Sequence, residues 1–191
     1  MPQYRRAFTP GGSYFLTIVT EHRAPILTTD SARAQLHAAI DACRRDRPFD
    51  IDAIVLLPDH WHILLTLPPG DADYPTRIAS IKAQFNRQYL AAGGHEQPRS
   101  PSRLRSRRRG VWQRHFWEHQ IRDTTDLHAH IDYIHYNPVK HRLTHCPHAW
   151  PYSSFTGAVA KKHYTQDWQC TCQNRRPIVP NFDSLPIHHM E

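Results

Sequence analysis

Residues 51–67 hold two apolar runs on either side of a short polar break, and this stretch constrains the fold most strongly. The break is Pro58-Asp59, which is typical of a turn between two paired strands. We therefore expect a β-hairpin with strands over about 51–57 and 60–67. Because successive side chains of a strand point to opposite faces, one face of the second strand is fully apolar. Its members are Trp61, Ile63, Leu65 and Leu67.

The other face of that strand begins with His60 and His62. Two neighbouring imidazoles at a strand end can hold one metal ion, since histidine is the most common metal-ligating side chain. The chain has 16 histidines in 191 residues, so composition alone gives about 1.3 His-x-His pairs. A second pair, His128 and His130, falls in a helical pattern, where residues two apart do not face each other. The apolar context favours a metal site at the first pair; two hydrogen-bonded structural histidines are the alternative.

The elements expected around the hairpin follow a recognisable order. Aromatic and β-branched runs predict strands over 13–20 and 111–121. Apolar stripes at helical spacing predict helices over 31–45, 76–92 and 123–137. The resulting order is that of an α+β ferredoxin-like sandwich, an antiparallel sheet with packed helices. We expect one domain over residues 1–158 and a polar tail with little regular structure over residues 159–191.

Basic residues outnumber acidic ones by 24 to 17, a net charge of +7. This excess favours an anionic partner, nucleic acid before a membrane surface, with a merely basic soluble protein as the alternative. No apolar run approaches a membrane span, and no secretory signal precedes the domain, so a cytoplasmic protein is expected. Residues 93–110 are rich in arginine and almost free of apolar side chains. We expect a mobile basic loop that contacts a nucleic-acid backbone; a solvated loop is the alternative.

The cysteines are Cys43, Cys146, Cys170 and Cys172. Four are too few for a disulfide scaffold in a chain of this length, so reduced thiols are expected. Cys170 and Cys172 have the character of a metal-binding pair, but the sequence shows no second pair that would complete a zinc site.

The helix expected over 123–137 has a polar flank. At 100° per residue, its core stripe comprises Leu127, Ile131 and Ile134. The flank comprises Asp126, His130, Tyr133 and Asn137. Tyr133 and Asn137, four residues apart, can therefore serve one site, whereas Tyr136 lies opposite the core. Pro138 disfavours helical geometry in the residue before it, so Asn137 is expected to end the helix. The alternative to a shared site is that Asn137 only ends the helix and that Tyr133 is an aromatic residue at the edge of the core.

Three separated motifs resemble the single-tyrosine transposases of the His-hydrophobic-His class. They are Leu-Pro-Asp-His-Trp-His (57–62), Phe-Trp-Glu-His (116–119) and Asp-Tyr-Ile-His-Tyr-Asn-Pro-Val-Lys-His (132–141). The branch associated with repetitive extragenic palindromes (REP) in bacteria also resembles this chain at Tyr4-Arg5-Arg6, at Gly11-Gly12 and over 45–49 and 150–155. The resemblance spans about residues 4–155. The long arginine-rich segment 93–109 and the tail depart from it without touching a motif residue.

The resemblance implies a domain, residues 1–158, that cleaves and rejoins single-stranded DNA at REP hairpins through a 5′-phosphotyrosine. By the same resemblance His60, His62 and Asn137 bind a divalent metal, Mg²⁺ or Mn²⁺, and Tyr133 is the nucleophile, with Tyr136 as its rival. Asp126 and His130 either handle the proton or are polar surface. The partner would be single-stranded DNA with a hairpin, bound by a monomer or a homodimer in the bacterial cytoplasm, near the nucleoid and away from any membrane.

Candidate DNA contacts come from four parts of the chain. They are Tyr4, Arg5 and Arg6 at the N-terminus, then Arg44, Arg45 and Arg47, then Arg105, Arg107, Arg108 and Arg109, and finally Lys140. Two other functions fit the same residues. One is a hairpin-binding protein without catalysis, and the other is a zinc hydrolase that uses water as its nucleophile.

Overall fold

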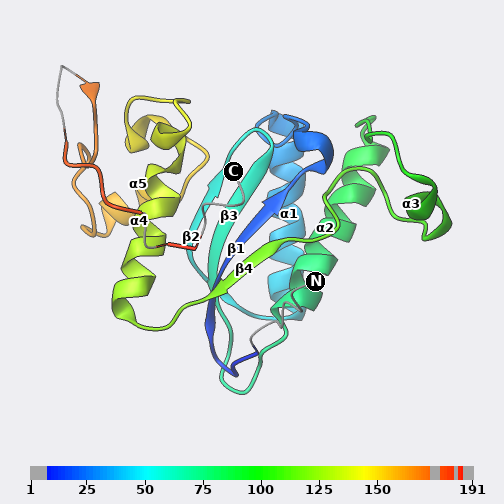
Figure 1. The fold of residues 1–191 in the computed structure, drawn as a ribbon, viewed down its shortest axis with the longest axis horizontal. Coiled ribbons are helices and arrows are strands. Elements are labelled where there is room, and N and C mark those ends of the chain that lie inside the picture. Colours follow the sequence, from blue (N-terminus) through cyan, green and yellow to red (C-terminus); the bar gives the residue numbers. More distant parts are fainter. Residues whose placement is uncertain (1–7, 173–176, 183–184, 187–191) are drawn as a thin grey trace.

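A four-stranded antiparallel sheet lies at the centre of the computed structural model, which describes residues 8–172, 177–182 and 185–186. The strands are β1 (Ser13–Val19), β2 (Asp50–Leu56), β3 (His60–Thr66) and β4 (Trp117–Gln120), in the spatial order β2-β3-β1-β4. Helices α1 (Asp30–Asp46) and α2 (Tyr74–Ala91) lie on one side of the sheet, and α4 (Thr124–Lys140) lies on the other (Figure 1). This arrangement confirms the expected ferredoxin-like sandwich. The predicted contacts Tyr4, Arg5 and Arg6 fall outside the described residues.

The hairpin forms as expected and fixes the two faces of the sheet. Strand β3 pairs with β2 and β1, so that His62 lies opposite both Val55 and Thr17. Trp61, Ile63 and Leu65 are fully buried in the core with α1 and α2. The histidines therefore face α4, because their side chains alternate with those of the apolar set.

Helix α4 differs from its prediction in length and in the face that it buries. Three residues follow Asn137 within the helix, with Pro138 in its last turn, and the His141 N–H donates to the Asn137 carbonyl over 3.0 Å. A proline in a last turn removes one hydrogen bond without ending the helix. The predicted polar flank is buried together with Ile134 of the predicted core stripe, whereas Leu127 and Ile131 are only partly buried. The reason is that the facing sheet surface itself carries polar side chains.

Residues 93–110 are more structured than their composition predicts. They contain the short helix α3 (Pro101–Arg105). Arg103 pairs with Glu21 over 2.6 Å, and the Gly110 N–H donates to Glu96 over 2.8 Å. Polar and charged contacts thus hold a segment that is almost free of apolar side chains.

The strand expected over 111–121 is shorter than predicted, since only Trp117–Gln120 pairs with β1. Ahead of it, Trp112 makes an isolated bridge with Thr20 and packs its ring 5.0 Å from that of Phe85. The Gln113 N–H still donates to the Val19 carbonyl over 2.9 Å, so the segment follows the end of β1 and its pairing is interrupted before β4.

Beyond α4 the chain forms two single turns, η2 (Pro147–Ala149) and α5 (Phe155–Ala160), and the described part of the tail has no further helix or strand except isolated turns. That part is packed nonetheless, with Leu185 buried against the α4 side of the sheet. The division into a domain and a tail stays a prediction. Among the described residues, none of the helices combines the length and apolar character needed to cross a bilayer.

Candidate metal and tyrosine site

His60 and His62 lie side by side at the start of β3, with ring centroids 5.0 Å apart, and both are buried. Each Nδ1 atom has a hydrogen-bond partner, one from the preceding residue and one from strand β1. His60 Nδ1 lies 2.6 Å from an Asp59 carboxylate oxygen, and His62 Nδ1 lies 2.9 Å from the Thr17 hydroxyl. The two Nε2 atoms are buried, and that of His60 has no hydrogen-bond partner among the described residues. Partners on Nδ1 orient an imidazole so that Nε2 can bind a metal.

Asp59 fixes the proton on the His60 ring. Burial raises the pKa of Asp59, but the hydrogen bond and charge of His60 and the guanidinium of Arg23 outweigh it and hold that pKa at about 2. An ionised carboxylate accepts a hydrogen bond, so His60 carries its proton on Nδ1. The lone pair of a neutral His60 is then on Nε2, which is the tautomer that a metal requires.

Tyr133 and Asn137 project from the buried face of α4, one helical turn apart. The Tyr133 ring lies 5.5 Å from the His62 ring, and Asn137 is fully buried together with its side-chain oxygen. The Lys140 ammonium donates to the Tyr133 hydroxyl over 3.1 Å. Phe182 of the tail lies edge-on to Tyr133 at 5.3 Å, and Tyr133 is 1% exposed. A phosphate therefore reaches this hydroxyl only if neighbouring side chains move.

The rival tyrosine has a different environment. Tyr136 is largely buried, and its ring lies 5.8 Å from that of Phe182. Burial raises the pKa of Tyr136, which disfavours the phenolate that attacks a phosphate. The ring contact with His62 and the hydrogen bond from Lys140 favour Tyr133 over Tyr136 as the candidate nucleophile.

His141 lies beside the candidate site and was not considered as a site residue in the sequence analysis. It caps α4, its ring lies 5.2 Å from that of His60, and its Nε2 atom is buried. A residue four positions after Asn137 lies on the same face of a helix. The sequence analysis expected the helix to end at Asn137, so it did not apply this spacing to His141. Imidazole and amide donors together suit a divalent ion such as Mn²⁺, which accepts nitrogen more readily than Mg²⁺ does.

Asp126 and His130 belong to a second cluster with His119 of β4, in which the potential ligand atoms lie within 4.8 Å of one another. Phe15 lies between the two groups, with its ring 5.3 Å from His62 and 4.9 Å from His130. Asp126 accepts hydrogen bonds from His119 over 2.8 Å and from the Arg122 side chain over 3.1 Å. A carboxylate already bound to a guanidinium is a poor site for a further cation.

The electrostatics of this cluster bear on proton transfer. Burial raises the pKa of Asp126, but hydrogen bonds from Arg122 and His119 hold it far below its usual range. Burial is also the main cause that lowers the pKa of His130. Asp126 is therefore an ionised anchor between β4 and the first turn of α4. The proton-handling role of these two residues stays a prediction.

The predicted DNA contacts separate into two regions. Arg44, Arg45 and Arg47 lie where α1 ends, at the end of the sheet opposite to His60. Arg107, Arg108 and Arg109 instead line a groove of about 760 Å³ beside α2, whereas Arg105 is not among its lining residues. The groove also contains Arg87, Arg103 and Arg114, and the aromatic rings of Trp112 and Phe116. Lys140 lies at Tyr133, inside the candidate site.

The fold and the candidate site are those expected of a tyrosine transposase, and comparisons with known proteins agree with this class. The family model described as "Transposase IS200 like" matches residues 10–137. A protein of Escherichia coli K12 named REP-associated tyrosine transposase is 40% identical over 168 residues, which cover 88% of this chain and 91% of that protein. A Haemophilus influenzae protein described as an enzyme of the same type is 45% identical over 168 residues, covering 88% of this chain and 93% of that protein.

The solved structure of a REP-associated tyrosine transposase bound to a REP hairpin is also similar. It is 38% identical, superposes with a TM-score of 0.74 and covers 94% of this chain and 100% of that one. The chain belongs to the IS200-like transposases and, within them, to the REP-associated tyrosine transposases. The enzyme class predicted from the three sequence motifs is thereby confirmed.

Proposed function

We propose that this protein cleaves and rejoins single-stranded DNA beside REP-type hairpins, through a 5′-phosphotyrosine formed on Tyr133. The observation that carries the proposal is the position of Tyr133, 5.5 Å from the His62 ring and bound by Lys140. A nucleophile, a cation beside it and buried metal-ligating atoms thus meet on one face of the sheet. The resemblance to a structure bound to a REP hairpin supports the choice of substrate.

His60, His62 and Asn137 would hold the divalent metal ion, and His141 offers a further donor beside His60. When bound, such an ion neutralises the charge of the non-bridging phosphate oxygens and orients the phosphate. Asp59 and Thr17 hold the two imidazole rings in position for it.

The covalent step needs a nucleophile that is also a good leaving group. The Tyr133 oxygen attacks the phosphorus, the bond to the 3′ oxygen breaks, and that oxygen takes a proton to become a free 3′-hydroxyl. The 5′-phosphate then stays on Tyr133. Because a phenol has a pKa near 10, its phenolate leaves far more readily than an alkoxide. A 3′-hydroxyl can therefore reverse the attack and reseal a strand without a nucleotide cofactor.

The arginine-lined groove would bind the DNA backbone, since each neutralised phosphate releases counterions. Phe116 lines the groove and is only partly buried, and an aromatic ring of this kind can stack on an unpaired base. The groove lies beside α2, on the other side of the sheet from Tyr133. The bound DNA would therefore extend around the edge of the sheet.

The decisive experiment incubates the protein with labelled hairpin oligonucleotides and Mn²⁺, followed by a denaturing gel. We expect a protein–DNA adduct with the natural chain and with Tyr136→Phe, and none with Tyr133→Phe. Hairpin binding should persist in all three. A hairpin-binding protein without catalysis forms no adduct in any of them. A zinc hydrolase cleaves without an adduct and continues to cleave after Tyr133→Phe.

A further inference from the structure

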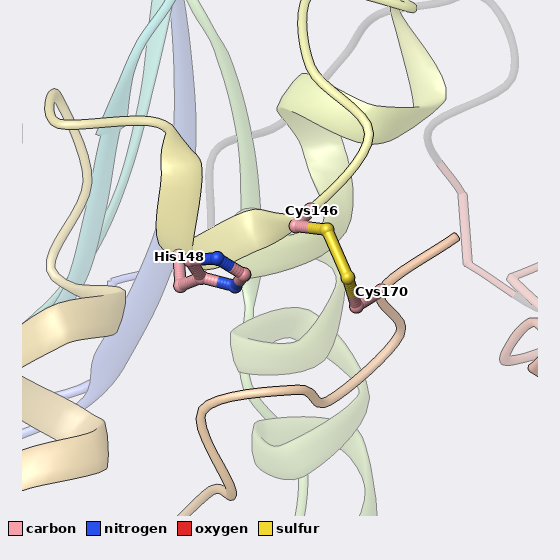
Figure 2. A group of neighbouring side chains, drawn as sticks. All are labelled: Cys146, His148 and Cys170. Carbon is pink, nitrogen blue, oxygen red and sulfur yellow. A yellow bond between two sulfur atoms is a disulfide. The ribbon is translucent and has the colours of Figure 1, made fainter. Parts of the chain in front are cut away.

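Three cysteines and one histidine from two distant segments meet beside the end of α4. Cys146 and His148 belong to the turn around η2, and Cys170 and Cys172 belong to the tail. The ligand atoms of Cys146, His148 and Cys170 all lie within 4.8 Å of one another (Figure 2). The Cys172 sulfur lies outside that group but only 2.8 Å from the Cys146 sulfur, so a fourth potential ligand atom is adjacent to it.

The backbone holds the two segments together at this point. The Thr171 N–H and the Thr171 hydroxyl both donate to the His145 carbonyl over 3.0 Å. Thr171 lies between Cys170 and Cys172, and His145 directly precedes Cys146. The hydrogen bonds therefore set one Cys-x-His pair beside one Cys-x-Cys pair. Cys146 and Cys170 are buried, whereas His148 and Cys172 are exposed.

The structure joins Cys146 and Cys170 as a disulfide, as Figure 2 shows with His148 beside the bonded sulfurs. That bond accounts for two of the four side chains and leaves an exposed thiol next to it. Such a thiol is placed for exchange with the disulfide. One tetrahedral Zn²⁺ would instead use all four side chains, and three cysteines with one histidine form a standard structural zinc set.

We propose that in the reduced protein Cys146, His148, Cys170 and Cys172 bind one structural Zn²⁺ ion. Binding releases the protons of three thiols to the solvent, and the neutral His148 imidazole completes the set. No redox change of the metal or the protein is involved. With four protein ligands the coordination is closed, which is typical of a structural and not a catalytic site.

The zinc site has a physical purpose in this part of the chain. Residues 161–172 are mostly exposed, and the aromatic contacts that fix them to the domain come from Tyr164 and Trp168, which pack against Phe155. Metal binding supplies free energy of folding where a small core cannot. The ion would thereby attach the first part of the tail to the segment that follows α4.

The test uses the full chain, purified with a reductant, and Co²⁺ as a spectroscopic probe for the zinc site. Thiolate ligands give Co²⁺ a strong near-ultraviolet charge-transfer absorption, which the sulfur-free site at His60 and His62 cannot produce. We expect this absorption with the natural chain, displacement of Co²⁺ by one equivalent of Zn²⁺, and a thermal midpoint that rises with Zn²⁺.

Single-ligand variants distinguish the zinc site from the disulfide. Cys172→Ser and His148→Gln, both at exposed positions, should each weaken Zn²⁺ binding by at least about tenfold. Cys43→Ser, at a buried cysteine in α1, is the matched control and should bind Zn²⁺ as the natural chain does. If the reduced natural chain gives no thiolate–cobalt absorption, or if Cys172→Ser binds Zn²⁺ unchanged, the proposal is wrong.

Discussion

The ammonium of Lys140 donates a hydrogen bond to the Tyr133 hydroxyl over 3.1 Å, and the same nitrogen lies 4.8 Å from the centre of the Tyr133 ring. The two residues are seven apart, so two turns of α4 bring them to one face. A positive charge beside a phenol favours the phenolate form. Lys140 was expected to contact the DNA backbone, and its position also places it beside the proposed nucleophile, Tyr133.

Lys140→Met should slow single-turnover adduct formation by about 10- to 100-fold, the range typical of a group that assists proton transfer or charge stabilisation. The rise of the rate with pH should move to higher pH, because the phenolate loses its cationic neighbour. Lys140→Arg should restore part of the rate, and Lys161→Met, at an exposed position after α5, should be silent. Weaker hairpin binding with an unchanged single-turnover rate would instead assign Lys140 to the DNA backbone.

Removal of a metal ligand should be visible without any cleavage assay. Asn137→Ala and His141→Ala are each expected to weaken Mn²⁺ binding by about tenfold or more, as measured by electron paramagnetic resonance, because a divalent ion loses one donor. His37→Ala, on the exposed face of α1, is the control. Unchanged Mn²⁺ affinity after His141→Ala would leave that residue a neighbour of His60 and not a ligand.

The alternation of the hairpin was readable in the sequence because one face of β3 is apolar without exception. The helical wheel likewise grouped Tyr133 with Asn137 correctly. It oriented α4 wrongly because it assumed that a buried face must be apolar, whereas here His60, His62 and Thr17 make the facing surface polar. Local patterns therefore grouped the candidate site residues correctly. Which face of α4 is buried depended on the sheet surface that it packs against.

His141 and the pair Cys146-x-His148 were missed for different reasons. His141 was missed because Pro138 was expected to end α4, although a proline in the last turn costs only one hydrogen bond. The pair Cys146-x-His148 was missed because its partner pair lies 24 residues further on and meets it only through the tertiary structure. Chain separation of that size leaves no periodic signal in a single sequence.

The arginine-lined groove predicts a specific salt dependence. The double substitution Arg107→Ala, Arg108→Ala removes two exposed charges from it. The slope of log affinity against log salt concentration should then decrease by about 1.5, since each phosphate contact contributes about 0.7 to 0.9. Lys161→Ala with Lys162→Ala, at two exposed positions after α5, is the matched pair and should leave the slope unchanged. Fluorescence anisotropy with a labelled hairpin over a potassium chloride series measures both.

Arg77 of α2 is buried and forms an ion pair with Asp71 over 2.6 Å. Its guanidinium also donates to the carbonyls of Pro48 and Asp73. Arg77→Met removes the donor to these carbonyls and to Asp71. It should lower the free energy of unfolding by about 3 kcal/mol. This is the lower end of the range for a broken buried ion pair, because Asp71 is partly exposed. Urea unfolding measures the loss. Arg87→Met, at an exposed position of the same helix, should change stability by no more than about 0.5 kcal/mol.

His135 predicts how stability depends on pH. It is buried, its Nε2 atom lies 3.0 Å from the Ser154 hydroxyl, and burial lowers the pKa of His135 from 6.5 to about 4. The unfolded chain therefore binds a proton at a pH where the folded chain does not. The contribution of His135 to the free energy of unfolding should be constant above pH 6.5 and should fall as the pH drops towards 4. Over that window the loss is about 1.4 kcal/mol per pH unit, or about 3 kcal/mol in total.

The substitution His135→Asn keeps a polar group near Ser154 but cannot titrate, so its unfolding free energy should decline less steeply between pH 6.5 and pH 4 than that of the natural chain. Slopes are compared and not absolute values, because the smaller side chain also loses packing against Phe155 and Tyr164. His128→Asn, at an exposed position of α4, should keep the natural slope. Carboxylates such as Asp59 titrate alike in all three proteins, so parallel curves for His135→Asn and the natural chain would show that His135 is already protonated when folded.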